Sequence, residues 1–232
     1  MDALLGYSLE DLMLFSRETY LRLFELYHRD VWPAQILVGA LGIAFLQPVL
    51  VGRRTRIRAM LAVLALIWLW VGYAFHLERY ATINWAATSF AWLFAAQAGL
   101  LLIAAIWPGG LRGGPAWARG TGAAILGFAL AVLPLAEIAL GRGWREVEFF
   151  ALTPDATAFA TLGVLVALSG AWRWLLALVP LTWCVIGGGT LLAMNSPEAY
   201  LSWGAALVAL VMLAASAFDK DERMRRQNFA SK

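Results

Sequence analysis

The chain has 232 residues, of which 62% are hydrophobic and 14% are charged, and its formal charge at pH 7 is +3. This composition excludes an ordinary water-soluble domain. The arginines and lysines stand in short clusters beside apolar segments, which is typical of membrane topology and excludes nucleic acid as the expected partner. We therefore expect an integral membrane protein whose main surroundings are the lipid bilayer.

The first 30 residues are amphipathic rather than continuously apolar. Tyr20, Phe24 and Tyr27 recur at helical spacing, while charged residues occupy the opposite face. Ser16 is expected to cap this helix, because its hydroxyl can accept a hydrogen bond from the first turn. We predict that residues 1–30 form an interfacial segment along the membrane surface.

Seven apolar runs follow, and together they fill residues 31–218. They cover about residues 31–51, 59–77, 85–107, 123–140, 153–169, 174–194 and 196–218. A polar loop, Gly141 to Thr153, is expected before the fifth run. The predicted fold is therefore all-α: a polytopic transmembrane helical bundle of seven spans, preceded by the amphipathic interfacial helix and followed by a basic cytoplasmic tail at residues 219–232.

The basic residues predict the orientation of the bundle. They concentrate after the first, third, fifth and seventh runs, whereas those on the other side are diluted among Asp and Glu. The concentrated set is Arg53, Arg54, Arg56, Arg58, Arg112, Arg119, Arg173, Lys220, Arg223, Arg225, Arg226 and Lys232. By the positive-inside rule this places the N-terminus outside and the C-terminus in the cytoplasm.

One acid lies inside an apolar run. Glu137 stands about one turn before the outer end of the fourth run, where an unpaired charge costs several kcal/mol. It must therefore be paired, protonated or open to water, and Arg79 is its candidate partner by depth. We predict one outward-open polar pocket here, to which we assign Glu137, Arg79, His76, Gln97, Tyr73, Tyr80 and Asn84.

The two histidines of the chain, His28 and His76, fall on the same predicted side. With Asp30 they are weak candidates for a metal site, because imidazole and carboxylate suit Zn, Fe or Mn. The competing interpretation, which we favour, is that each is an interfacial histidine with its polar tip in water. No cofactor and no catalytic residue is assigned, and the motifs of nucleotide loops and common hydrolases are missing, so an enzyme is disfavoured.

The sixth run contains Pro180 and three consecutive glycines, Gly187 to Gly189. Such residues can break a helix in the middle of a membrane, as in many transporters. Glycine is also the usual residue for close helix contact, and we favour this packing interpretation.

Several segments carry a resemblance to known sequences: Leu14 to Ser16, Arg22 to Tyr27, Trp32 to Gln35 and Trp68 to Ala87. Together they resemble an uncharacterised bacterial family of multi-pass membrane proteins, classed as a domain of unknown function. The resemblance covers nearly the whole chain and implies a place in the bacterial inner membrane. It implies no substrate, cofactor or catalytic residue.

Two functions remain open, with a third ranked below them. The first is transport or binding of a small molecule or ion through the outward-facing pocket. The alternative is an accessory or assembly subunit that packs against a membrane-protein partner, or a homo-oligomer. The third is an intramembrane metal-dependent enzyme.

Overall fold

The computed structural model describes residues 15–107 and 110–230, with residues 218–230 described by their backbone alone. The chain before Phe15 and the side chains of the predicted basic tail lie outside the described residues. In chain order the elements are α1 (Arg17–Asp30), α2 (Ala34–Val51), α3 (Arg54–Trp70), η3 (Val71–Leu77), η4 (Tyr80–Thr82), α4 (Ala87–Ile106), β1 (Arg112–Gly113), α5 (Ala116–Gly127), η5 (Phe128–Val132), α6 (Leu133–Ala139), α7 (Pro154–Val166), β2 (Leu168–Ser169), α8 (Trp172–Ala193) and α9 (Ala199–Ala230).

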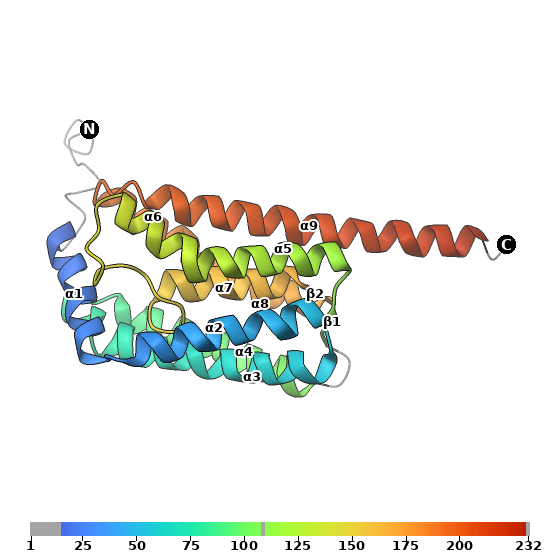
Figure 1. Ribbon diagram of the computed structural model, residues 1–232, viewed down its shortest axis with the longest axis horizontal. Helices are drawn as coiled ribbons and strands as arrows, with labels where there is room; N and C mark the ends of the chain where they lie inside the picture. Colours follow the sequence, from blue (N-terminus) through green and yellow to red (C-terminus); the bar gives the residue numbers. More distant parts are fainter. Residues whose placement is uncertain (1–14, 108–109, 231–232) are drawn as a thin grey trace, which may run out of the picture.

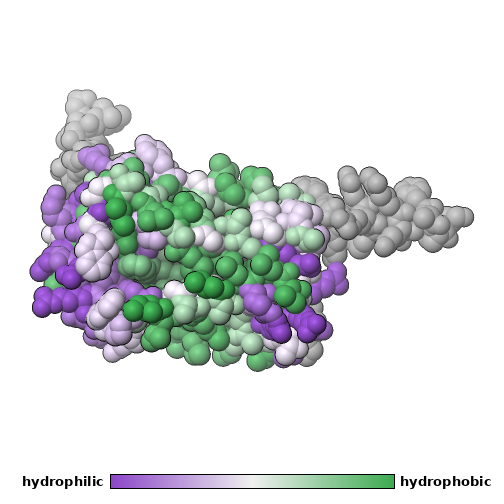
Figure 2. Space-filling model, in the orientation of Figure 1, coloured by the Kyte–Doolittle hydropathy of each residue, from purple (hydrophilic) through white to green (hydrophobic). Residues whose placement is uncertain are grey.

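The long helices lie side by side in one elongated bundle, and α1 crosses one end of it (Figure 1). We call this the α1 end and the opposite end, where β1 pairs with β2, the β1 end. Six helices are long and apolar enough to cross a membrane: Ala34–Val51, Arg54–Thr82, Ala87–Ile106, Ala116–Ala139, Trp172–Ala193 and Ala199–Ala217. On the face drawn in Figure 2, hydrophobic side chains form a belt between two hydrophilic ends. The all-α expectation is confirmed, with one two-residue strand pair added.

The fifth predicted span is a shorter helix than expected. α7 has 13 residues, all of them buried, whereas a helix needs about 20 residues to cross a bilayer. The chain before α7 enters the bundle from the α1 end, and its residues 150–152 are buried. The predicted polar loop from Gly141 to Thr153 is therefore wrong in its second half, which is apolar chain inside the bundle.

α7 fits inside the bundle because it carries small residues. A Cβ on Gly163 would lie 2.8 Å from the Gly122 carbonyl oxygen of α5, so the two backbones are in contact. The Thr161 hydroxyl donates to the Thr157 carbonyl at 2.7 Å and accepts from the Trp68 indole at 2.9 Å. Close small-residue contacts and hydrogen bonds between helices are what holds helices together in lipid.

α1 is amphipathic as predicted, and its apolar face packs on protein. Tyr20, Phe24 and Tyr27 are buried. The ring of Phe24 lies 5.0 Å from that of Phe75 in η3. The Ser16 hydroxyl accepts a hydrogen bond from an amide of the first turn at 3.3 Å, so the predicted cap is confirmed. α1 therefore covers the α1 end of the bundle.

α8 is continuous from Trp172 to Ala193, so its glycine run does not break the helix. The glycines make room for neighbours instead. A Cβ on Gly187 would lie 2.7 Å from an Asp155 carboxylate oxygen, and one on Gly188 would meet the Trp203 indole. The packing interpretation is confirmed for these two positions.

Candidate functional site

A cluster of buried charged side chains lies beneath α1, and we call it the buried ionic network. Each member is at most 5% exposed. The members are Glu137 in α6, Arg142 and Glu148 in the following loop, Asp155 in the first turn of α7, and Glu198 just before α9. They meet because the α6–α7 loop and the α8–α9 turn both lie at the α1 end (Figure 1).

Arg142 holds two carboxylates of the network together. Its Nη1 lies 3.1 Å from Glu137 Oε1, and its Nε lies 3.1 Å from Glu198 Oε1. The guanidinium carbon also lies 5.8 Å from the centre of the Phe24 ring, which is within the range of a cation–π contact. Glu198 has a second cationic partner, since Arg17 Nη2 lies 3.2 Å from the same Oε1 atom. Arg17 therefore connects α1 to the network.

Glu148 links the loop to α7. Its backbone amide donates to Glu137 Oε2 at 2.7 Å. Its own Oε2 accepts from the backbone amides of Asp155 at 3.1 Å and Ala156 at 3.4 Å. The carboxyl thus satisfies two amides at the N-terminus of α7 that have no partner within the helix.

Asp155 extends the network towards α8 and α9. Its Oδ1 accepts from the Trp183 indole at 2.7 Å, and its Oδ2 accepts from the Ser202 hydroxyl at 2.9 Å. Gly187 leaves the space that this carboxyl occupies. The Asp155 carboxyl therefore joins α7 to α8 and α9 through neutral donors, and within the described residues it forms no ion pair with an arginine.

The acids of the network outnumber its bases. Four carboxyl groups face Arg142 and Arg17, which leaves two negative charges if every group is ionised. Burial, and after it the neighbouring Asp155 and Glu137, raises the pKa of Glu148 well above its usual value. Burial alone would lower the pKa of Arg142, but the surrounding carboxylates raise it, so this arginine stays charged. Of the groups in the network, Glu148 is therefore favoured to hold a proton, because its raised pKa stabilises the neutral carboxyl.

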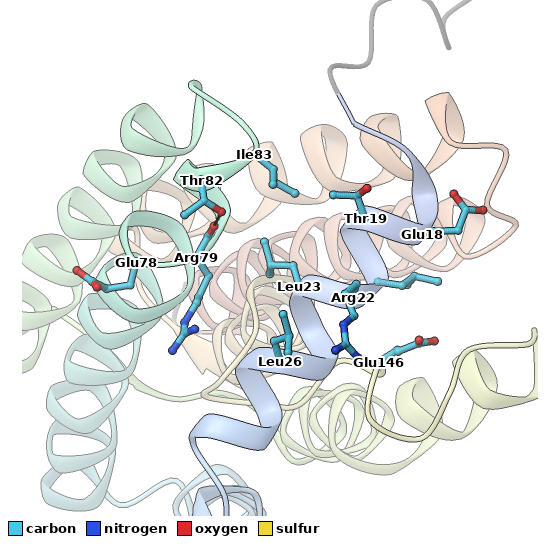
Figure 3. A pocket seen from close by; sticks show the side chains of 11 residues that line it. Glu18, Thr19, Arg22, Leu23, Leu26, Glu78, Arg79, Thr82, Ile83 and Glu146 are labelled. Atoms are coloured by element: carbon cyan, nitrogen blue, oxygen red, sulfur yellow. Dashed lines mark hydrogen bonds between the residues drawn. The ribbon is translucent and has the colours of Figure 1, made fainter.

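A groove of about 710 Å³ lies on the outer side of α1. Figure 3 shows α1 crossing it, with Leu23 and Leu26 between Arg79 on one side and Arg22 and Glu146 on the other. Further along, the walls are made by Glu18, Thr19, Leu21, Glu78, Thr82 and Ile83. The groove thus combines an apolar floor with charged walls.

The two arginines of the groove are neutralised by acids outside its lining. Arg79 Nη2 lies 2.8 Å from Asp30 Oδ2, and Arg22 pairs with Glu25 one turn along α1. Among the described residues, the three acids that line the groove, Glu18, Glu78 and Glu146, have no such ion pair. The groove therefore presents a surplus of negative charge.

Glu146 joins the groove to the buried ionic network. Its carboxylate lines the groove and accepts from the Gly143 amide at 2.8 Å. Its backbone carbonyl accepts from Arg142 Nη1 at 3.4 Å. A ligand that moves this loop would therefore also move the hydrogen bonds of Arg142.

The predicted pairing of Glu137 with Arg79 is wrong. Glu137 is buried as expected, but its cation is Arg142, which the chain supplies only five residues later. Arg79 lies on the surface at the end of the helix and reaches Asp30 of α1 instead. The two side chains thus have different ion-pair partners, so similar predicted depth in the membrane does not bring them together.

Of the remaining predicted pocket residues, His76 and Tyr80 lie together, with ring centres 6.1 Å apart, whereas Tyr73 and Gln97 have other surroundings. His76 and Tyr80 are buried, and the ring of His76 lies 4.5 Å from Phe94 and 4.9 Å from Trp183. Tyr73 is exposed at 53%. Gln97 is buried and donates to the Leu176 carbonyl of α8 at 2.9 Å, so it joins two helices.

Asn84 also has a structural role. Its side-chain oxygen accepts from the Ala86 amide at 3.0 Å and so orders the turn before α4, whose N-cap residue is Ala86. Of the predicted pocket residues, only Arg79 lines the groove of Figure 3.

The weak metal candidates are separated in the structure. His28 Nδ1 lies 2.8 Å from the Arg145 carbonyl oxygen, and Asp30 pairs with Arg79. His76 lies among aromatic rings. Within residues 15–107 and 110–217, whose side chains the structure describes, no three His, Cys, Asp or Glu residues form a group that could hold a metal ion.

Sequence reasoning missed most of the network. Arg142 and Glu148 fell in the predicted polar loop, and neither Asp155 nor Glu198 was assigned to the predicted pocket. A signal was present in the loop, because the charged stretch 142–148 runs directly into the apolar stretch 149–152. The apolar end of such a loop is expected to be buried in the protein. The charged residues next to it are then brought into the protein as well.

The fold and the site define a class: a helical bundle with six apolar helices of membrane-spanning length and a charged network buried at one end. The chain belongs to a family of unknown function, DUF6064, whose model matches residues 17–224. The comparison with curated proteins and the comparison with solved structures found no match. The matched range includes α1 and every element of the network.

Proposed function

We propose that the chain is an integral protein of the bacterial inner membrane that crosses the bilayer seven times, with the α1 end outside. Among the described residues six helices have the required length, and α7 together with the buried turn before it, residues 150–152, leads from the α1 end towards the β1 end. Arg53 precedes α3 at the β1 end, and Arg54, Arg56 and Arg58 lie in the first turns of α3, which favours a cytoplasmic location for that end.

We further propose that the protein binds a small molecule or ion from the outside and couples this binding, or transport, to a proton in the buried ionic network. The observation that carries the proposal is the surplus of buried carboxyl groups over arginines. Ionisable groups at membrane depth are costly and typically serve proton or ion pathways. The connection through Glu146 supplies the coupling between groove and network.

The groove favours a ligand that carries a positive charge and an apolar body. Its arginines are neutralised, its acids are not, and Leu21, Leu23 and Leu26 form an apolar floor. An amine with a hydrocarbon group satisfies both features, because its charge meets the carboxylates while its body covers the leucines.

The proton is tested by infrared spectroscopy of the protein in lipid nanodiscs at neutral pH. The C=O stretch of a protonated carboxylic acid is expected in the wild type, because burial and the neighbouring acids raise the pKa of Glu148 and favour its neutral form. It should be lost in Glu148→Gln and retained in Glu78→Gln, which changes an exposed acid. A wild-type spectrum without such a band would overturn the proton proposal.

The ligand is tested with phenethylamine, phenethyl alcohol and phenylpropionate. They share a phenethyl body and carry a cationic ammonium, a neutral hydroxyl and an anionic carboxylate, respectively. The amine should bind most tightly and the carboxylate least. The preference should fall in Glu78→Gln and stay in Arg56→Gln, which removes a charge at the β1 end. Equal binding of all three would contradict the groove assignment.

The coupling is tested by measuring amine affinity at mildly acidic and mildly alkaline pH. The affinity should depend on pH in the wild type and lose that dependence in Glu148→Gln. If the protein instead purifies with a stoichiometric partner chain that covers the groove, the alternative role of accessory subunit would replace the transport proposal.

A further inference from the structure

A second pocket, of about 340 Å³, lies beside the groove at the α1 end, and we call it the interfacial pocket. It is formed by the last turn of α1, the first turn of α2 and the α6–α7 loop. Its lining comprises His28, Arg29, Trp32, Gln35, Trp144, Arg145 and Phe149. None of these residues belongs to the groove or to the buried ionic network.

The interfacial pocket is positively charged. Arg29 and Arg145 line it, and no ion pair within the described part of the chain neutralises either one. The Arg145 guanidinium carbon lies 4.5 Å from the centre of the Trp144 ring, which holds it at the rim. Two guanidinium groups at one pocket are the usual means of binding a phosphate.

Two hydrogen-bond acceptors in the wall of the pocket lack donors. A carbonyl oxygen can only accept, so His28 Nδ1 donates to the Arg145 carbonyl, which leaves Nε2 as the acceptor of the neutral ring. The Gln35 amide nitrogen donates to the His28 carbonyl at 2.7 Å, which leaves its Oε1. His28 Nε2 and Gln35 Oε1 are both buried without a partner. A ligand with hydroxyl groups would supply the missing donors.

The pocket opens towards the apolar belt. Trp32 and Trp144 are 61% and 64% exposed, and exposed tryptophans are typical of the level where headgroups meet hydrocarbon. On α2, directly after Gln35, Ile36 and Leu37 are 62% and 70% exposed. A ligand in the pocket can therefore extend apolar chains along the first two turns of α2.

We propose that the interfacial pocket binds the headgroup of an anionic phospholipid with free hydroxyl groups, of the phosphatidylglycerol kind. The phosphate lies between Arg29 and Arg145, the glycerol hydroxyls face His28 and Gln35, and the acyl chains follow α2. The inference rests on the membrane placement proposed above and is independent of the proton and amine proposals. The lipid belongs to the leaflet at the α1 end.

The test uses nanodiscs of phosphatidylcholine that contain a minor fraction of phosphatidylglycerol or of phosphatidic acid with the same acyl chains. Native mass spectrometry counts the lipid retained by the released protein, and thermal unfolding reports its effect. Phosphatidylglycerol should be retained and should raise Tm relative to phosphatidylcholine alone. Phosphatidic acid, which lacks the glycerol hydroxyls, should be retained less.

Two variants and a matched control assign the effect to the pocket. Arg29→Gln with Arg145→Gln should lose the retention of phosphatidylglycerol, while Arg53→Gln with Arg54→Gln, which removes the same charge at the β1 end, should keep it. Gln35→Leu should reduce the preference for phosphatidylglycerol over phosphatidic acid. All four arginines lie at the two ends of the bundle, so circular dichroism in nanodiscs is expected to be unchanged.

The outcomes separate the possible sources of the phosphate. Equal retention of phosphatidylglycerol and phosphatidylcholine, or equal loss in both double variants, would overturn the site. If free glycerol 3-phosphate raises Tm as much as the lipid does, the pocket binds a soluble phosphate ester and the lipid assignment is wrong. Failure of the chain to enter nanodiscs would instead contradict the membrane placement.

Discussion

The two ends of the bundle each bury an arginine, but they surround it with different partners. At the α1 end, Arg142 bonds to the carboxylates of Glu137 and Glu198. At the β1 end, Arg173 donates to the backbone carbonyls of Leu168 and Leu213, each at 2.9 Å, and to the Ser216 hydroxyl. Both arginines are less than 5% exposed.

The difference shows which end is built to change its charge. Backbone carbonyls and a hydroxyl do not titrate. The hydrogen bonds by which Arg173 joins β2, α8 and α9 therefore persist at any ordinary pH. Carboxyl groups do titrate, and burying four of them costs more than burying neutral acceptors. That the chain places its titratable acids at the α1 end, beneath the groove, favours a functional rather than a purely structural reason for them.

The largest expected effect is the loss of Arg142. Arg142→Gln leaves Glu137 without its cation and Glu198 with Arg17 alone, and it should destabilise the protein by about 3–5 kcal/mol. Arg173→Gln loses hydrogen bonds to neutral groups and should cost about 1–3 kcal/mol. Thermal unfolding in one detergent, compared at neutral and mildly acidic pH, measures both changes.

The pH response distinguishes the two variants. Lower pH should restore part of the stability of Arg142→Gln, because protonation removes the uncompensated charges, and should not restore Arg173→Gln. The double variant Glu137→Gln with Arg142→Gln should likewise recover part of the loss. Strictly additive losses would show that the Glu137–Arg142 contact contributes nothing of its own.

A smaller effect is expected where helix backbones touch towards the β1 end. A Cβ on Gly122 would lie 2.7 Å from the Cβ of Ala167, whereas one on Gly120 of the same helix meets nothing within 4 Å. Gly122→Val should therefore cost about 1–3 kcal/mol through overpacking, and Gly120→Val much less. Because no titratable group is involved, the loss in Gly122→Val should be the same at mildly acidic and neutral pH.

The helices could be predicted from the sequence because the length and hydropathy of each apolar run indicate a helix in apolar surroundings. Ser16 was predicted as a cap because capping is local, and the structure confirms it. α7 was overestimated for the same reason: its hydropathy is that of a span, but the sequence does not show that the chain before it enters the bundle unwound. The predicted fifth span is therefore divided between α7 and the buried turn that precedes it.

The network could not be predicted because its pairs depend on the packing of distant segments. Glu198 meets Arg142 across 56 residues and Arg17 across 181. Depth along the membrane normal narrows the candidates for Glu137 but does not choose among them, since it says nothing about which helices are neighbours. The Glu137–Arg142 pair could have been predicted from the sequence, because the two residues are only five positions apart.

The smallest expected effect concerns His28 at the α1 end. Burial lowers the pKa of His28 below its ordinary 6.5, against the opposing hydrogen bond to the Arg145 carbonyl. The groups that face the ring are Phe24, Tyr27 and Phe149, together with Arg29 and Arg145 of the interfacial pocket. No acid within the described residues compensates a charge there, so the folded state keeps the ring neutral.

The sign of the pH dependence follows from the number of protons that each state binds. Because the pKa of His28 is lower in the folded state, the unfolded chain binds this proton more readily, so the contribution of His28 to stability is present above pH 6.5 and is lost as the pH falls through the lowered pKa. Glu148 acts in the opposite direction, because its raised pKa lets the folded state bind the extra proton and so favours folding at lower pH. The dependence of wild-type stability on pH is therefore the sum of both contributions, and only the difference between a His28 variant and the wild type isolates His28.

His28→Gln removes the titration and keeps a side-chain amide that can donate to the Arg145 carbonyl. Measured against wild type, its Tm should rise as the pH is lowered through the ordinary histidine range, and parallel curves would mean that the folded protein admits the proton at His28 as readily as the unfolded chain does.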